Sequence, residues 1–427
     1  MQDRGAREGS RQWRHVALGE VKALIHVDGV ARVALFLKLL EGLRAGGPET
    51  DPAEGVAALF VTESRPAARR LRAAGEEVIR LSPRRRRPDA ELRRLYARSL
   101  CGRLGALPPG LAAGYHAEIG ALLAAARPDV IWCWNGTKFI DRCLAASGLP
   151  LRALETANIA GHFVIEEGGT NAESGTFRAL GSGAAPPPPE GFDYAAWRRA
   201  WLAGKERPGA PPQARLTGDD LAEKLGQLLT PWRMTPRYIA FSADRALGYL
   251  LKRPVTAALA ALGKARERGG RAPGRLTYLP QQVSSDSQLL FHAAHDNRSA
   301  LRLALCQLPR GGALVSNLHP AEHRLSQMLA FGWMALREPR LIPAAGPSWP
   351  LLTRAEEVVT INSTVGLEAG ILGRPCRFLG RSLFERLLAE PALLTWYLGA
   401  HIVPLAAAEA RPLPEAIRRR LLPDALR

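Results

Sequence analysis

The stretch from Glu357 to Pro375 constrains the fold more than any other part of this sequence. A β-branched run, Val358 to Ile361, turns at Ser363 into an apolar helical segment that ends at Gly373. This order predicts a strand, a tight turn and a helix. Such a turn directs backbone amides and the positive end of a helix at whatever lies above the sheet, which suits a phosphate group. Taken alone, the stretch also fits an ordinary capped helix.

Small side chains and hydroxyls flank the turn. Gly366 and Gly370 lie four residues apart on one helical face, where they would let the helix approach the sheet closely. Ser363 and Thr364 place hydroxyls at the mouth of the turn.

Strands of this kind alternate with helical segments through two parts of the chain. The predicted strands are Val21–Val27, Val56–Val61, Val78–Leu81, Asp129–Trp134, Leu151–Glu155, Arg275–Pro280, Ala313–Asn317, Val358–Ile361 and Cys376–Leu379. The alternation favours parallel, doubly wound sheets. We therefore predict an α/β fold of GT-B-like type, in which two Rossmann-like lobes face a central cleft with a helical insertion between them.

Composition breaks suggest where the parts divide. Four consecutive prolines end at Pro189, and a helical pattern with a capping box at Thr217 and Asp220 then runs from Tyr194 to Arg268. The aromatic side chains there are predicted to pack between helices: Trp197, Trp201, Trp232 and Tyr238. The predicted parts are a basic tail (1–20), an N-terminal lobe (21–180), a spacer and helical segment (181–270), a C-terminal lobe (271–411) and a C-terminal helix (412–427).

The charge balance points to an anionic partner. The 427 residues carry a formal net charge of +18, and arginine supplies most of it. A nucleotide, a phospholipid surface or a nucleic acid would each fit, although no nucleic-acid-binding motif accompanies the charge. The run Arg84–Arg87 fits a solvated face, or contact with an anionic membrane surface.

The compartment follows from what the chain lacks. Its five cysteines are scattered without a Cys-x-x-Cys pair, so neither a disulfide framework nor a zinc knuckle is indicated. No apolar leader follows the basic N-terminus, and no apolar run is long enough to span a membrane. We expect a cytoplasmic protein that could still lie on a membrane surface.

Polar residues follow several predicted strands at their carboxyl ends, where open α/β sheets bind ligands. Glu155 ends one strand of the first lobe, and three polar segments follow strands of the second lobe: Gln281–Gln288, Ser316–Glu322 and Asn362–Thr364. His319 stands before Pro320, where a helix is predicted to begin and where the histidine could donate to a phosphate oxygen. Asp286 and Glu155 would form a carboxylate pair if they faced one another across a cleft.

A metal site is not predicted. His319 and His323 lie four apart, and His292 and His295 lie near Asp296, but none of these matches the His-Glu-x-x-His pattern. There is no Asp-x-Asp signature either.

Together, these segments resemble the bacterial capsule polysaccharide synthesis family. The resemblance rests on Leu279–Gln288, His319–Glu322, Val359–Ala369 and Gly373–Gly380 in the second lobe, and on Glu155 and the loop Gly168–Ala172 in the first. It spans roughly 129–384. Glu166 and Glu167 depart from the family pattern, where an aspartate is expected, and so does the proline run.

The resemblance implies a single-module, retaining β-Kdo glycosyltransferase that uses CMP-β-Kdo. Asp286 would be the nucleophile and Glu155 the acid/base, while His319, Ser363 and Thr364 would hold the CMP phosphate. The other residues implied for donor binding are Gln282, Gln288, Pro320, Glu322 and Asn362. Gly168, Gly169 and Asn171 would form an acceptor or sugar loop.

The resemblance also implies partners and a place of action. The first lobe would serve the acceptor and the second the nucleotide-sugar donor. The acceptor would be a lyso-phosphatidylglycerol or a β-Kdo linker at the inner leaflet, so the enzyme would lie peripherally on the inner membrane. No cofactor, metal or nucleic acid is implied, and other capsule biosynthesis enzymes are candidate partners.

Two other functions remain open from the sequence. A GT-B enzyme for another nucleotide sugar would share the phosphate-binding turn and His319 but would not need the Glu155–Asp286 pair. A non-catalytic capsule assembly or export component, or a nucleic-acid binder, would account for the charge alone.

Overall fold

The computed structural model describes residues 21–46, 55–183, 187, 189–206, 243–269 and 275–422, which form two compact units. The first unit contains the described residues up to Arg178 and those from Ala400 onward, and the second contains the described residues between Ala179 and Gly399. The predicted basic tail, the capping box at Thr217 and Asp220, Trp232 and Tyr238 lie outside the described residues.

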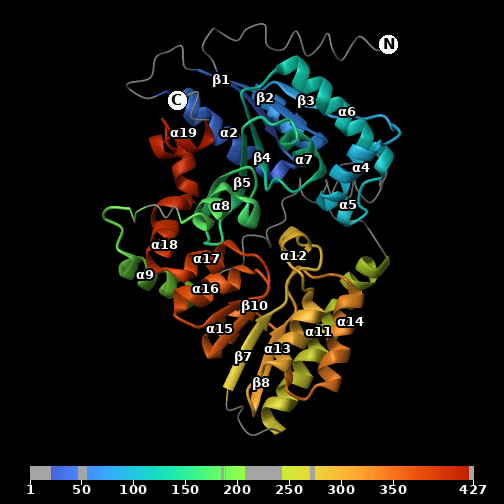
Figure 1. Ribbon diagram of the computed structural model, residues 1–427, viewed down its shortest axis with the longest axis vertical. Helices are drawn as coiled ribbons and strands as arrows, with labels where there is room; N and C mark the ends of the chain where they lie inside the picture. Colours follow the sequence, from blue (N-terminus) through green and yellow to red (C-terminus); the bar gives the residue numbers. More distant parts are fainter. Residues whose placement is uncertain are drawn as a thin grey trace. The chain divides into compact units, whose positions relative to one another are not determined.

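The first unit is built on a seven-stranded sheet in the order β12-β6-β5-β4-β1-β2-β3 (Figure 1). Its strands are β1 (Val21–His26), β2 (Val56–Thr62), β3 (Val78–Arg80), β4 (Val130–Trp134), β5 (Leu151–Thr156), β6 (His162–Glu167) and β12 (Val403–Pro404). Strands β1 to β5 are parallel, whereas β6 pairs antiparallel with both β5 and β12. The parallel part is the doubly wound sheet that the alternation predicted.

Helices cover both faces of this sheet. They are α2 (Val30–Arg44), α3 (Arg65–Ala73), α4 (Ala90–Ala97), α5 (Leu100–Arg103), α6 (Pro109–Ala126), α7 (Phe139–Ala145) and α19 (Glu415–Leu421). The unit also has the short turns η1 (Asn171–Glu173) and η4 (Leu405–Glu409), and α8 (Gly175–Gly181) begins in it. Successive residues of β1 alternate between the faces, since Ile25 packs with Phe36 of α2 and Leu24 packs with Phe139 of α7. Both faces are therefore closed by apolar packing.

The C-terminal segment completes the first unit. Strand β12 pairs with β6, and the indole nitrogen of Trp132 on β4 donates to the carbonyl oxygen of Leu421 at 3.1 Å. Leu413 and Ile417 belong to the same buried cluster as β1. The described chain from Ala400 onward thus differs from the predicted division, in which the C-terminal lobe ran to residue 411, because these side chains bury themselves on the first sheet.

The second unit has a five-stranded parallel sheet in the order β11-β10-β7-β8-β9. Its strands are β7 (Arg275–Pro280), β8 (Gly312–Asn317), β9 (Leu341–Ala344), β10 (Glu357–Thr360) and β11 (Cys376–Phe378). Its helices are α9 (Tyr194–Glu206), α11 (Ala243–Gly269), α12 (Ser287–His292), α13 (Asn297–Cys306), α14 (Leu325–Arg337), α15 (Ser348–Arg354), α16 (Thr364–Leu372), α17 (Leu383–Ala389) and α18 (Pro391–Trp396), and η3 (Tyr397–His401) follows. The predicted fold class, α/β with two Rossmann-like lobes, is confirmed.

The described helices α9 and α11 are part of the second unit, although 181–270 was predicted as a separate segment. Arg198 of α9 donates to the backbone oxygens of Ile371 and Leu372, and Trp201 packs edge-on against Trp349 at 5.4 Å between ring centroids. Trp201 therefore packs against a neighbouring helix, as its helical setting predicted, whereas Trp197 stacks on Tyr194 and Trp201 within α9.

Two strands were not predicted. They are β6, whose last residues Glu166 and Glu167 pair with β5, and β9. The helix predicted to begin after His319 and Pro320 starts only at Leu325.

The sequence suggested that Gly366 and Gly370 both let α16 approach the sheet closely, and the structure confirms this for Gly366 alone. A Cβ atom on Gly366 would lie 2.5 Å from the ring of Phe378 on β11 and 3.0 Å from the Cγ2 atom of Thr360 on β10. Gly370 also sits in a tight contact, but its neighbour is Leu388 of α17 and not the sheet. Gly366 thus sets how near α16 lies to the strands.

We expect Gly366→Ala to destabilise the second unit by roughly 1–3 kcal/mol, because the added methyl group overpacks the helix against Phe378 and Thr360. Gly332→Ala, in helix α14, is the matched control, since the added Cβ would meet only the side chain of Leu259 on α11, at 3.7 Å. That variant should be unchanged or more stable by up to about 1 kcal/mol. Urea unfolding of the three proteins gives the comparison, and equal stabilities would contradict the packing argument.

Candidate functional site

Each sheet reverses its strand order at one place. In the second unit the chain adds β8 and β9 on one side of β7 and then places β10 on the other side. In the first unit β2 and β3 follow on one side of β1, and β4 pairs on the other. The loops that leave the carboxyl ends of such neighbouring strands run to opposite faces and leave a crevice, which is where open α/β sheets bind ligands.

In the second unit, amide side chains tie the loops of this crevice together. Gln282 follows β7, and its side-chain nitrogen donates to Oδ1 of Asn362, which follows β10, at 2.8 Å. The Asn362 side chain donates in turn to the backbone oxygen of Gln288 at 2.8 Å, and Asn297 exchanges two hydrogen bonds with the backbone of Gln282. Gln282 and Asn362, which resemblance assigned to donor binding, are buried and hold the crevice in shape.

Asp286 lies in the loop that follows β7 and is the N-cap residue of α12. Its Oδ1 accepts from the backbone nitrogen of Gln288 at 2.8 Å, and the side chain is half-buried. Burial raises the pKa of this carboxyl above its ordinary value, and the bond from Gln288 partly offsets the effect. A carboxylate in this position combines partial desolvation with a fixed orientation, as a nucleophile requires.

Glu322 shapes the loop that follows β8. Its carboxylate is buried and accepts from three backbone nitrogens: those of Ser284 at 2.7 Å, His323 at 2.9 Å and Arg324 at 2.8 Å. This use of the backbone amides organises a turn, which is why the helix starts four residues later than predicted. Pro320 is exposed before this turn, so the helix end expected beside His319 is absent.

His319 can still donate a hydrogen bond to an anion, although no helix begins beside it. Its Nδ1 accepts from the backbone nitrogen of Ala321 at 3.0 Å, which leaves the proton of the neutral ring on Nε2. Burial lowers the pKa of His319 and outweighs the nearby charge of Glu322. The ring is therefore a neutral hydrogen-bond donor near neutral pH.

The turn into α16 has the predicted form. Ser363 is the N-cap, its Oγ accepts from the backbone nitrogen of Val365 at 3.2 Å, and Gly373 ends the helix with a positive φ. A recess of about 570 Å³ lies beside this turn, since Gly380 in its wall bonds to the backbone of Ile361. The recess is lined by Phe291, His292, Ala293, Ala294, Phe378, Leu379, Gly380, Arg381 and Glu385.

In the first unit, Glu155 lies near the end of β5 with its carboxylate held from the loop after β4. Asn135 donates from Nδ2 to Oε1 of Glu155 at 2.8 Å, and Thr137 donates to Oδ1 of Asn135 at 2.6 Å. Asn135 has a φ of 68°, a left-handed conformation that asparagine tolerates better than most residues. Thr170 donates to the backbone oxygen of Asn135, which brings the loop Gly168–Asn171 beside Glu155.

That loop is shaped by its small and left-handed residues. Gly168 and Asn171 both have positive φ, and a Cβ on Gly169 would lie 3.0 Å from the Cβ of Glu173. The structure therefore brings Glu155 and the predicted sugar loop together within the first unit.

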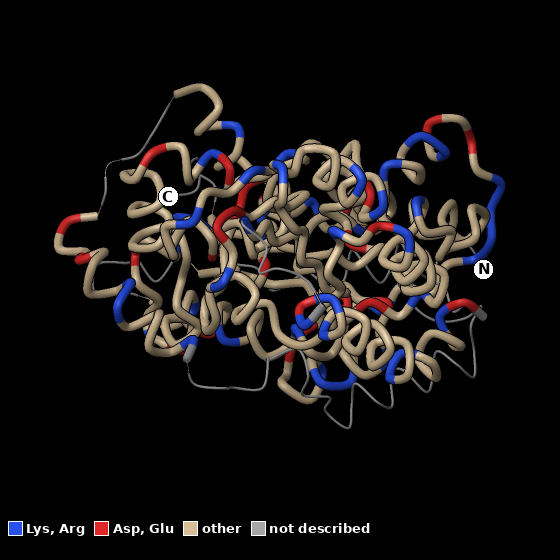
Figure 2. Tube along the Cα trace, turned by 90° about the horizontal axis from the view of Figure 1, so that it is seen from below, with Lys and Arg blue, Asp and Glu red and all other residues tan. Residues whose placement is uncertain are grey.

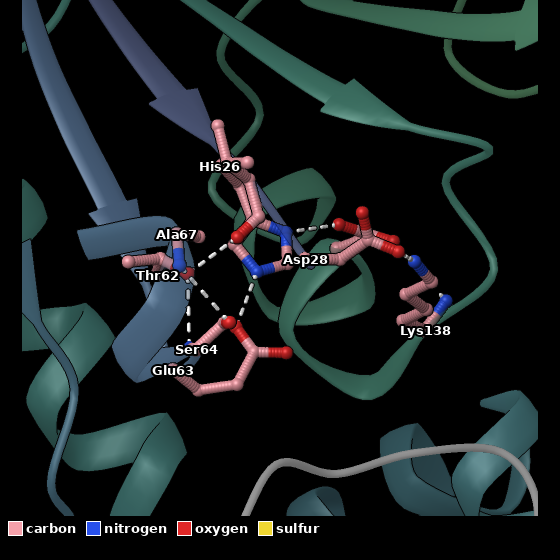
Figure 3. Close-up of polar contacts among 9 residues, drawn as sticks. His26, Asp28, Thr62, Glu63, Ser64, Ala67 and Lys138 are labelled. Atoms are coloured by element: carbon pink, nitrogen blue, oxygen red, sulfur yellow. Dashed lines mark hydrogen bonds and ion pairs between the residues drawn. The ribbon is translucent and has the colours of Figure 1, made fainter. Parts of the chain in front are cut away.

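A buried ionic cluster at the crevice of the first unit was missed by the sequence analysis (Figure 3). His26 ends β1 and lies between two carboxylates: its Nδ1 is 2.6 Å from Oδ1 of Asp141, and its Nε2 is 3.0 Å from Oε2 of Glu63. Lys138 and Asp28 form an ion pair beside it. All five side chains follow or end β1, β2 and β4, so charged residues just beyond three apolar strands were the available signal.

The carboxylates keep this histidine charged. Burial by itself would lower the pKa of His26, but the charges of Asp141 and Glu63 outweigh it and raise the pKa from 6.5 to about 10. Buried charges of this kind persist only when each has a partner. Clusters with perturbed pKa values also gather at functional sites, and this one lies at the switch point of the sheet.

The remaining basic residues are spread along both units (Figure 2). The run Arg84–Arg87 is exposed in a loop whose backbone bonds to α6 through Arg86 and Gly110. Among the described residues, no helix is long and apolar enough to cross a membrane.

Fold and site together define an α/β protein of two Rossmann-like units, each with polar residues at the switch point of its sheet. Residues 236–422 match the model of a family described as capsule polysaccharide biosynthesis protein. The matched residues include the second-lobe motifs on which the predicted resemblance rests.

Solved structures with partial likeness include two from Thermosulfurimonas dismutans. The β-Kdo 2,7 transferase of KpsC is 12% identical, with a TM-score of 0.37 over 84% of this chain and 79% of that chain. The β-Kdo 2,4 transferase of KpsC is 15% identical, with a TM-score of 0.29 over 60% and 70%. A UDP-GlcNAc 2-epimerase from Neisseria meningitidis is 10% identical, with a TM-score of 0.25 over 94% and 99%. No curated protein matches the sequence.

We expect His26→Ala to destabilise the first unit by about 3–5 kcal/mol, because Asp141 and Glu63 would be left as buried charges without the imidazolium. The pKa of His26 is higher in the folded than in the unfolded protein. Its contribution to stability is therefore full below pH 6.5 and is lost as the pH rises towards about 10. Thermal unfolding between pH 6 and 10 measures both effects.

The exposed His116 of α6 provides the control, because His116→Ala should leave stability and its pH dependence unchanged. If wild type and His26→Ala lost stability in parallel between pH 6.5 and 10, the cluster would not be the source of the pH dependence.

Proposed function

We propose that this protein is a retaining glycosyltransferase that moves Kdo from CMP-β-Kdo to an acceptor in capsular polysaccharide biosynthesis. One observation carries the proposal. The polar segments after β7, β8 and β10, which carry the family resemblance, converge at one crevice of the second sheet and are joined by the Gln282–Asn362 and Glu322–Ser284 hydrogen bonds. This is the edge at which α/β sheets bind nucleotides.

The donor would bind at the second unit. Ser363, Thr364 and the first amides of α16 would face the CMP phosphate, and the Nε2 proton of His319 would add a hydrogen bond. The recess bounded by Phe291 and Arg381 offers space for the rest of the donor. These groups favour negative charge, which grows on the phosphate as CMP leaves.

The proposed chemistry uses two carboxylates in two steps. Asp286 would attack the anomeric carbon of Kdo, forming a glycosyl-enzyme ester as the bond to CMP breaks. Glu155 would then take the proton of an acceptor hydroxyl, whose oxygen attacks the same carbon and releases Asp286. Neither step uses a metal ion or a cofactor. Asp286 belongs to the second unit and Glu155 to the first.

The acceptor and setting follow from the same proposal. A lyso-phosphatidylglycerol or β-Kdo-linker glycolipid would meet the first unit at Glu155 and the loop Gly168–Asn171. The enzyme would then work at the cytoplasmic face of the inner membrane, with other capsule biosynthesis enzymes as candidate partners.

The decisive experiment is mass spectrometry of products formed from in situ CMP-Kdo and a synthetic β-Kdo-linker acceptor. We expect a product heavier by Kdo with wild type, and a loss on the order of 10³-fold or more for Asp286→Asn. Since burial raises the pKa of Asp286, activity should begin to fall on acidification above the ordinary titration range of an aspartate.

Asp296→Asn is the matched control, because Asp296 caps α13 as Asp286 caps α12 and asparagine preserves both caps. Full activity of Asp286→Asn would remove Asp286 as nucleophile. Absence of transfer together with binding of a different nucleotide sugar would favour another GT-B chemistry, and absence of any donor binding would favour a non-catalytic role.

The position of Asn135 yields a second prediction for this reaction. Asn135→Gly tolerates the positive φ but removes the bond that orients Glu155, so kcat should fall about 10- to 100-fold with little change in the donor KM. Thr137→Ser keeps a hydroxyl for Asn135 and should stay near wild type. Steady-state kinetics on folded variants checks this, and equal loss in both would point to a general disturbance of the loop.

A further inference from the structure

Exposed large apolar side chains are concentrated on two helices of the second unit. Helix α14 carries Leu329, Trp333 and Leu336, and α11 carries Leu247, Tyr249, Leu250 and Leu251. Among the described residues, only Leu405 is a further exposed large apolar side chain. The two helices pack together, since Gly332 of α14 lies against Leu259 of α11. Figure 1 shows both helices beside the second sheet.

Helix α14 is apolar on two faces. Met328, Phe331 and Ala335 are buried and pack the helix on the second unit. Leu329, Trp333 and Leu336 are exposed by 55%, 56% and 65%, and their spacing of four and three residues places them on one outward stripe. A helix on a domain surface ordinarily presents polar residues there. The outward stripe therefore needs a partner that covers apolar side chains.

Basic side chains border this stripe. A groove of about 610 Å³ runs between α13 and α14, and its lining includes Arg298, Arg302 and Arg337 against the single acidic residue Glu338. The guanidinium of Arg337 lies 4.2 Å from the centre of the Trp333 ring. Glu338 is engaged by Arg340 at 3.1 Å, so it does little to neutralise the groove.

We propose that this surface, the α14 face, docks the protein on an anionic phospholipid bilayer. We define the α14 face as Leu329, Trp333, Leu336, Arg298, Arg302 and Arg337. Tryptophan, leucine and arginine on one helix surface suit the boundary between acyl chains and headgroups, where apolar side chains enter and guanidinium groups meet lipid phosphates. The excess of arginine around the stripe favours an anionic bilayer over an apolar protein partner.

The docking adds to the proposed function, and only the biological purpose of the docking rests on that function. A lipid-linked acceptor is confined to the bilayer, so a transferase held at that surface meets its acceptor in two dimensions. The docking itself needs neither donor nor acceptor, because it depends on the stripe and the arginines alone.

Flotation of the full chain with extruded vesicles tests the proposal. Wild type should bind vesicles that contain phosphatidylglycerol, bind pure phosphatidylcholine at least tenfold more weakly, and dissociate as the salt concentration rises. Leu329→Glu/Trp333→Glu should reduce binding at least tenfold. Arg302→Gln and Arg337→Gln should each reduce it about fivefold, as expected for single basic residues at an anionic surface.

Two controls separate the α14 face from general effects. Leu405→Glu adds the same charge at an exposed leucine of the first unit and should leave binding unchanged. Leu250→Glu tests whether α11 is the docking surface instead. Equal vesicle binding by wild type and Leu329→Glu/Trp333→Glu would overturn the proposal.

Light scattering in parallel tests a second copy as occupant. A concentration-dependent dimer that Leu329→Glu/Trp333→Glu abolishes, without vesicle binding by wild type, would also overturn the proposal. Transfer of Kdo to a water-soluble acceptor does not require a membrane. Its presence or absence therefore judges the proposed function separately from the docking.

Discussion

The reversal of strand order within the parallel part of each sheet is the constraint on which the rest of the structure depends. Once β10 pairs on the opposite side of β7 from β8, the loops after β7 and β10 must leave towards opposite faces of the sheet. Neither following helix can then cover the gap between them. Backbone amides and polar side chains are left at this edge, and the same holds for β1 and β4 in the first unit. Catalytic or ligand-binding groups can lie there because the topology leaves these positions uncovered.

Polar residues at these edges divide into those that shape the crevice and those that face it. Gln282, Asn362 and Glu322 are buried and use their side chains on the backbone and on one another. Asp286 and His319 are partly exposed beside them, with one face fixed by a backbone nitrogen. The residue type in a motif therefore does not by itself show whether a side chain contacts a ligand or stabilises a loop, because asparagine, glutamine and glutamate can do both.

The two crevices differ in how much charge they bury. The second unit uses mainly neutral amides and one buried carboxylate, whereas the first concentrates His26 between Asp141 and Glu63. Desolvation makes such a cluster costly unless each charge has a partner at hydrogen-bonding distance. The cluster joins three strand ends and one helix start, so it also fixes the loops that surround Glu155. A loop held in this way can keep the left-handed Asn135 in place.

The sequence by itself determined the elements whose pattern is local. The strand, turn and helix around Ser363 were predictable because β-branched residues, a capping hydroxyl and Gly373 act within a few residues of one another. The close packing at Gly366 was predictable from the sequence as well. Only the tertiary structure decided that Glu322 delays the start of α14, that the chain after Ala400 completes the first sheet, and that His26 finds Asp141 and Glu63. Those outcomes depend on contacts between residues far apart in sequence, and no local pattern encodes which of them form.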